Sequence, residues 1–122
     1  MRELKFRAWD IKREEIIYVN GLQFNNDGLK QVRLYRGAYQ IRMAKNIVLM
    51  QYTGLKDKNE KEIYESDYLG DWCVFRGSGK YILHNISTGD IIDCDETNTI
   101  NKEINGNSYE TPREHKAMAS DL

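Results

Sequence analysis

Cysteine and long hydrophobic runs are scarce in this sequence of 122 residues. Its two cysteines, Cys73 and Cys94, are too few for a disulfide framework, and their spacing fits neither a redox pair nor a zinc knuckle. No apolar run approaches the roughly 20 residues of a membrane span, and the first residues lack the apolar core of a signal peptide. We therefore expect free thiols, a cytoplasmic location and no membrane contact, in one modest domain or one domain with an appendage.

A large net charge is also lacking, although the charges are unevenly placed. Lys and Arg number 18 against 19 Asp and Glu, a net charge of -1. This balance excludes nucleic-acid binding by bulk charge and a polyanionic mimic of nucleic acid. Residues 1–49 hold ten basic and five acidic residues, a net of +5, whereas residues 50–122 hold eight and 14, a net of -6. Halves of opposite charge can attract each other within one fold or between copies, so we predict a homo-oligomer.

Recognisable catalytic constellations are missing too. The two histidines, His84 and His115, fall in a predicted strand and in the C-terminal tail. No Gly-x-Ser-x-Gly elbow surrounds a serine, and the Gly77–Tyr81 run lacks the spacing of a phosphate-binding loop. We therefore predict a protein that is not an enzyme and needs no cofactor, and we interpret both histidines as surface or core residues.

Short β-branched and aromatic segments between Gly and Asn turns predict a mainly β fold. The most apolar segment, Ile47–Tyr52, is expected to be a buried strand. Several short strands at close spacing are typical of a small barrel or sandwich. Near the end of the chain, Thr111, Pro112 and Glu114 match a helix start, because they suit the cap, the first helical position and the capping box. A short C-terminal helix or tail is therefore expected over residues 111–122.

Two charged segments are candidates for contact with a partner. The first interleaves cations with aromatic rings, and arginine can contact phosphate while tyrosine stacks on a base. The alternative is a solvated or protein-contacting face. The second is an acidic loop whose carboxylates could hold Ca²⁺ or Mg²⁺ for phosphoester chemistry, although it lacks the Gly and closing Glu of an EF-hand. The candidate contacts are Lys30, Arg33, Tyr35, Arg36, Tyr39, Arg42 and Lys45 in the first segment, and Asp90, Asp93, Asp95 and Glu96 in the second.

Three blocks of the chain resemble the YopX family of phage and prophage proteins. The longest covers Leu49–Asn59 and continues through Lys61–Asp67, and the others are Lys5–Asp10 and Gly106–Pro112. The resemblance implies a bacterial or phage origin, and so the cytoplasm of a bacterial host. It also implies an SH3-like β-barrel in the C-terminal part. The expected organisation is an N-terminal β-hairpin or sheet segment over residues 1–62, a barrel over 63–110 and a short helix or tail over 111–122. The resemblance implies no catalytic residue, metal site or cofactor.

The chain departs from the family pattern at two turns. The family favours Gly at the positions that Glu60 and Ser66 occupy here. The loss of the turn Gly at Glu60 disfavours a tight type I′ hairpin, so we expect the loop there to differ.

Two functions follow from these observations. The leading hypothesis is a phage-encoded, non-catalytic protein that docks on a host or phage protein to modulate a host process such as a defence system. The alternative is a nucleic-acid or nucleotide-binding module that uses the basic Arg/Tyr segment 30–45.

Overall fold

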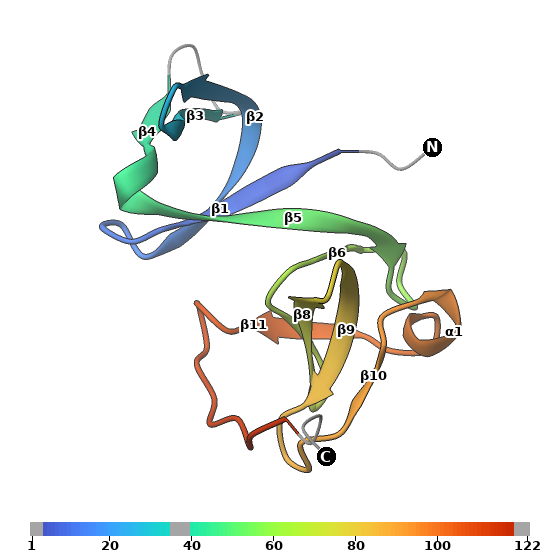
Figure 1. Ribbon diagram of the computed structural model, residues 1–122. Helices are drawn as coiled ribbons and strands as arrows, with labels where there is room; N and C mark the ends of the chain where they lie inside the picture. Colours follow the sequence, from blue (N-terminus) through green and yellow to red (C-terminus); the bar gives the residue numbers. More distant parts are fainter. Residues whose placement is uncertain (1–3, 35–39, 119–122) are drawn as a thin grey trace. The chain divides into compact units, whose positions relative to one another are not determined.

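The computed structural model describes residues 4–34 and 40–118, and its strands form two antiparallel sheets (Figure 1). The strand orders are β4-β3-β2-β1-β5-β6 and β10-β9-β8-β7-β11. The mainly β prediction is confirmed. The elements are β1 (Phe6–Asp10), β2 (Glu15–Asn25), β3 (Gly28–Leu34), β4 (Ile41–Met43), the 3-10 helix η1 (Ala44–Asn46), β5 (Ile47–Lys56), β6 (Glu62–Tyr64), β7 (Asp67–Leu69), β8 (Trp72–Gly77), β9 (Lys80–Asn85), β10 (Ile91–Asp93), α1 (Glu96–Thr99) and β11 (Ile104–Asn107).

The contacts divide the described chain into two compact units, an N-terminal unit of residues 4–51 and a C-terminal unit of residues 52–118. The sequence reading placed this boundary after residue 62. The structure places it inside β5, because Ile47–Gln51 pairs with β1 whereas Tyr52 and Lys56 pair with β6.

The N-terminal unit has a core on one face of its sheet. The register pairs Ala8 with Ile17 on β2 and with Leu49 on β5, and side chains of paired residues share a face. Val32 and Leu34 of β3 complete this core. An ionic group also lies on this face: Asp10, which pairs with Ile47 in the ladder and is only 1% exposed.

The C-terminal unit buries residues on both faces of its five-stranded sheet. Val74 pairs with Leu83, and both pack in the core that includes Ile63. The neighbouring pair, Cys73 and His84, points to the opposite face because strand side chains alternate. Both sides of β8 and β9 are therefore covered, and for this reason their sequences contain nearly continuous runs of apolar residues.

Two expectations about the C-terminal part need correction or stay open. The described strands do not make a closed barrel, so the SH3-like barrel is not confirmed. The edge strands of the five-stranded sheet, β10 and β11, pair with neither β5 nor β6 in the described residues. The helix expected from residue 111 is wrong as far as residue 118, because residues 111–118 form no helix. A helix this short is marginal in water, and hydrogen bonds to the rest of the C-terminal unit hold the segment instead, as Lys116 N–H donates at 2.8 Å to Ile86 O in the turn after β9.

The described part of the chain contains no helix long and apolar enough to cross a membrane.

Candidate binding cleft

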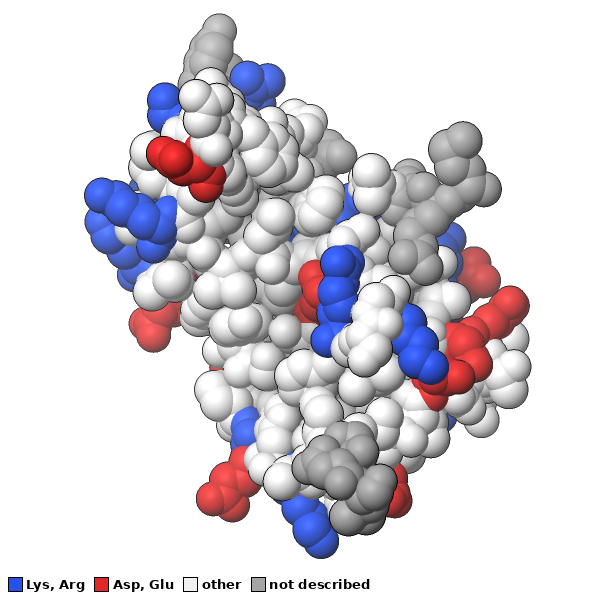
Figure 2. All heavy atoms as spheres, in the orientation of Figure 1, with Lys and Arg blue, Asp and Glu red and all other residues white. Residues whose placement is uncertain are grey.

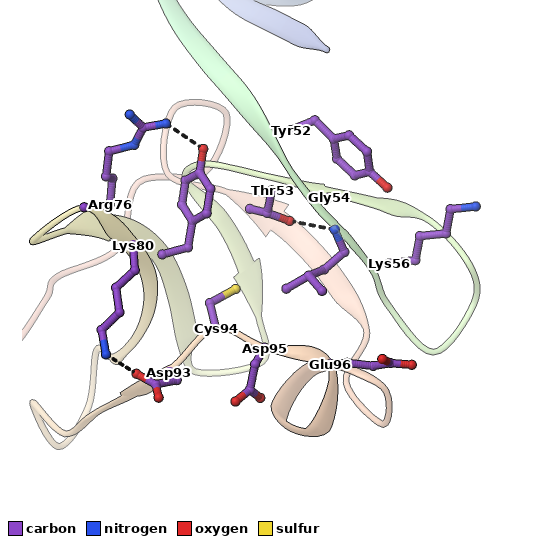
Figure 3. Close-up of a pocket in the computed structure, with 13 residues that line it drawn as sticks. Tyr52, Thr53, Gly54, Lys56, Arg76, Lys80, Asp93, Cys94, Asp95 and Glu96 are labelled. Carbon is purple, nitrogen blue, oxygen red and sulfur yellow. Dashed lines mark hydrogen bonds and ion pairs between the residues drawn. The ribbon is translucent and has the colours of Figure 1, made fainter. Parts of the chain in front are cut away.

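A cleft of about 880 Å³ opens in the C-terminal unit (Figure 3). It has three walls: the second half of β5, the β8–β9 hairpin, and the segment that leads from β10 into α1. Its volume falls within the range of about 300–1,000 Å³ that is usual for ligand-binding pockets. The lining residues are Tyr52–Lys56, Arg76, Gly79, Lys80, Tyr81 and Asp93–Glu96.

The β5 wall is a bulge. Between its two pairings with β6, β5 advances from Tyr52 to Lys56 while β6 advances only from Tyr64 to Glu62. Gly54, at φ 88°, absorbs the extra length, since this left-handed conformation favours glycine. The Thr53 hydroxyl donates to Ile63 O at 2.8 Å and accepts from Leu55 N–H at 3.2 Å. The buried threonine thus fixes a kink that turns consecutive residues toward the cleft.

The hairpin wall carries an arginine held on an aromatic ring. Arg76 Nη2 donates to the Tyr81 hydroxyl at 2.8 Å, and the guanidinium lies 5.2 Å from the centre of the Tyr81 ring. The hydrogen bond with Tyr81 raises the pKa of Arg76, and Glu65, whose Oε2 lies 3.7 Å from Arg76 Nε, adds to that shift. Arg76 therefore remains a positioned cation at the rim.

The third wall is acidic, and Figure 3 shows Asp93, Asp95 and Glu96 along it. Lys80 Nζ donates to Asp93 Oδ1 at 2.7 Å, between two exposed side chains. Asp95 caps α1, since its Oδ1 accepts from Asn98 N–H at 2.9 Å. The cleft therefore presents cations on the hairpin side and carboxylates on the α1 side.

The cleft holds a cysteine that is unsuited to nucleophilic chemistry. Burial, and secondarily the charge of Asp95, raise the pKa of Cys94 to about 12. The thiolate is the reactive form, so this thiol is almost entirely protonated and reacts slowly near neutral pH.

The acidic loop expected from the sequence is only partly brought together. Asp93, Asp95 and Glu96 line the cleft, whereas Asp90 lies outside it and accepts a hydrogen bond from Thr88 Oγ1 at 3.0 Å. Among the residues with described positions, no group of three or more His, Cys, Asp or Glu side chains is arranged to hold a metal ion.

The basic segment lies in the N-terminal unit and is divided between two sheet faces. Val32 pairs with Arg42 and Arg33 pairs with Ile41, so the two arginines point to opposite faces. Arg33 is exposed, as are Lys30 and Lys45. The Arg42 side chain is 13% exposed, and its Nε lies 2.8 Å from Asp10 Oδ2 on the core face.

The remaining members of the basic segment, Tyr35, Arg36 and Tyr39, lie outside the described residues. On the face shown in Figure 2, blue and red side chains are interspersed with white ones and form no continuous basic surface.

Sequence reading missed the β5 and hairpin walls of the cleft. It compared Gly77–Tyr81 with a phosphate-binding loop and assigned Thr53-Gly54 to the block shared with the family. A glycine that interrupts a long apolar strand is a known signal of a bulge. That signal was present at Gly54, but only the fold shows that Arg76 and Lys80 face it.

Comparisons with known proteins agree with the fold. A family model described as YopX protein matches residues 5–114. The chain is similar to the crystal structure of protein EF1440 from Enterococcus faecalis, with a TM-score of 0.72 and 22% sequence identity, over 92% of this chain and 97% of that one. At this identity the similarity shows the fold alone. No curated protein matches the chain.

Proposed function

Because the chain belongs to the YopX family, we propose that it is a small non-catalytic binding protein of phage or prophage origin, which docks on a host or phage protein through the cleft of the C-terminal unit. By docking it modulates a host process, such as a defence system. The observation that carries the proposal is a cleft of about 880 Å³ with cations on one wall and carboxylates on another.

The cleft chemistry favours binding over catalysis. Several of its ionisable groups are engaged in holding the walls, as Lys80 is with Asp93 and Asp95 is with the first turn of α1. Its thiol is protonated at neutral pH because the pKa of Cys94 is raised to about 12. What remains at the surface is a pattern of opposite charges, which selects partners by electrostatic complementarity.

The test is a charge swap across the cleft. The double variant Lys80→Glu/Asp93→Lys keeps an ion pair between these exposed positions but reverses the field that a partner meets. Exposed ion pairs contribute only about 0–1 kcal/mol, so the fold should be retained. Tagged proteins would be used to recover partners from host lysate treated with nuclease, with identification by mass spectrometry. We expect the swap to lose a partner that the unaltered chain recovers.

The matched control is Lys58→Glu/Glu103→Lys, which swaps another exposed ion pair outside the cleft and, like the cleft swap, leaves the net charge unchanged. It should recover the partner normally. Equal recovery by the swapped cleft would remove the cleft from the proposal, and no specific protein in any sample would contradict the binding function itself.

The nucleic-acid alternative makes a different prediction for the same experiment. Phosphate contacts release counterions, so such binding weakens steeply with salt and the recovered material disappears with nuclease. The alternative has less support than the docking proposal because Arg42 is engaged with Asp10. Recovery that collapses with nuclease, and is lost in Arg33→Glu, would favour it.

A further inference from the structure

Residues 111–118 form neither helix nor strand and lie against the C-terminal unit, and we call this segment the strap. Arg113 anchors its start. Its Nη2 lies 2.7 Å from Asp71 Oδ1, its Nη1 donates to Gly70 O at 2.9 Å, and its guanidinium stacks 5.1 Å from the centre of the Tyr68 ring. These contacts fix the strap across the β7–β8 turn.

The second anchor is at Lys116. Its N–H donates to Ile86 O, and its carbonyl accepts from His84 Nε2, both at 2.8 Å. A side chain at Gly89 would collide with the carbonyl oxygen of Ala117, so the strap approaches this turn closely. The strap is therefore held at both ends by polar contacts to the sheet.

Between the anchors, His115 lies on a buried cluster. Its Nε2 is 3.0 Å from the Tyr68 hydroxyl, and its ring centre is 5.8 Å from that of His84 and 6.0 Å from that of Phe75. Tyr68 packs with Cys73, which is fully buried, on the same face of the sheet. The strap thus covers a face that is otherwise apolar apart from His84.

One proton position on His84 follows from its partner. The Lys116 carbonyl can only accept, so Nε2 carries a proton. The Nδ1 of His84 is buried and has no hydrogen-bond partner among the described residues.

Few apolar contacts hold the strap to the C-terminal unit. Residues 111–117 are all exposed, and a segment with few buried apolar contacts opens at a lower free energy than the core beneath it. Its attachment therefore depends on the polar contacts around His115 and at the two anchors.

We propose that the strap is a pH-sensitive cover, which lifts from the sheet when His115 is protonated and uncovers the face that carries Tyr68, Cys73 and His84. The groups that face His115 favour its neutral form. Neither His84 on β9 nor the Arg113 guanidinium in the strap offers a negative charge to His115. Tyr68 on β7 and Cys73 on β8 are neutral, and the carboxylate of Asp71 is already paired with Arg113.

The direction of the pH effect follows from the lowered pKa of docked His115. Burial, then the proximity of His84 and Arg113, lower this pKa from 6.5. A free strap therefore binds the proton more tightly than a docked one, so docking is strongest above pH 6.5 and weakens as the pH falls below it.

The two cysteines provide a matched pair of reporters. Cys73 lies under the strap, whereas Cys94 packs in the core on the opposite side of the sheet. Burial is the main cause that raises both pKa values, each to about 12, so the thiolate fractions of the two thiols vary with pH in the same way. The ratio of their labelling rates therefore reports opening of the strap rather than reagent chemistry.

Labelling with an uncharged thiol reagent would be measured for Cys94→Ser, which leaves Cys73, and for Cys73→Ser, which leaves Cys94. The range from about pH 7.5 to 5.5 brackets the ordinary histidine pKa. We expect the Cys73 rate to rise several-fold relative to the Cys94 rate as the pH falls, and this rise to vanish when His115→Gln is added to both proteins.

Hydrogen exchange of the unaltered chain tests the proposal without relying on the folding of any variant. The Lys116 amide, normalised for intrinsic exchange, should lose protection at low pH while amides in β9 keep theirs. A constant Cys73 to Cys94 ratio, a rise that persists in His115→Gln, or parallel loss of protection in the strap and β9 would each overturn the proposal.

Discussion

At the scale of single residues, buried carboxylates with backbone donors organise the turns of this protein. Asp10 Oδ1 accepts from Lys12 and Arg13 N–H, both at 3.0 Å. Asp57 accepts from three backbone N–H groups, two in its own turn and one from Ile104 at 3.0 Å. Side chains of this kind stabilise a turn because they satisfy donors that the chain reversal leaves unpaired.

The first prediction concerns the ion pair on the core face of the N-terminal unit. Replacing Arg42 with Ala leaves Asp10, which is 1% exposed, without its cation. We expect the free energy of unfolding to fall by about 2–4 kcal/mol, because breaking a buried pair leaves a buried charge without its partner. Arg33→Ala, on the opposite face, should change it by less than about 0.5 kcal/mol. Urea denaturation of both variants measures this, and equal losses would contradict the assignment of faces.

The second prediction concerns Asp57. Burial by itself raises the pKa of this carboxyl, but the backbone donors of Ile104, Lys61 and Asn59 together outweigh burial and lower it below 3.8. Its stabilising contribution is therefore present above that value and is lost as the pH falls through the lowered pKa.

Asp57→Asn keeps the side-chain shape but replaces one acceptor with a donor. We expect a loss of about 1–3 kcal/mol at neutral pH and a flatter acid limb in thermal unfolding. Asp27→Asn, at an exposed turn, serves as the control and should leave both unchanged. An unaltered acid limb in Asp57→Asn would show that another carboxyl governs acid stability.

At the scale of elements, two turns depart from the glycine that the family favours, and the backbone shows the consequence. Glu60 has φ 65° and Ser66 has φ 74°, both in the left-handed region. The Asp57–Lys61 turn nevertheless closes, with Asp57 N–H donating to Lys61 O at 2.9 Å. The expected difference in the loop is thus taken up as backbone strain.

The third prediction follows from that strain. Left-handed backbone costs a residue with a Cβ about 1–2 kcal/mol, and the extra unfolded-state entropy of glycine offsets about 0.5–1 kcal/mol of the relief. Glu60→Gly and Ser66→Gly should each stabilise the protein by about 0.5–1 kcal/mol. Lys58→Gly, in the same turn but without a positive φ, should not. Melting temperatures test this, and destabilisation by both glycines would refute it.

At the scale of the whole molecule, the unequal charge of the two halves is the dominant feature. Residues 1–49 carry +5 and residues 50–122 carry -6. Opposite charges on one chain can pair between copies head to tail, and small domains gain buried surface by association.

The fourth prediction is therefore self-association that weakens with salt. Screening shortens the reach of charge to about 10 Å at 0.1 M and about 3 Å at 1 M. Light scattering at low salt should give a mass above that of one chain, 14.3 kDa, and at high salt a smaller one. A monomer at all concentrations would contradict the prediction.

The sequence by itself determined the local features. β-branched runs and glycine turns fix the mainly β class, because strand pairing and chain reversal depend on residue type over a few positions. The motif around Leu49–Asp67 identified the family, which the match over residues 5–114 confirms. Ile47 and Tyr52 are buried, as their place in the most apolar segment predicted.

Only the tertiary structure decided what distant segments do together. The helix signature at Thr111 does not give a helix because residues remote in the sequence, such as Ile86 in the turn after β9, offer the strap hydrogen-bond partners. The Arg42 side chain points to the core face because it donates a hydrogen bond to Asp10, which lies 32 residues earlier in the chain. The cleft exists because the Gly54 bulge faces a hairpin, and pairing between remote segments leaves no signal in local sequence pattern.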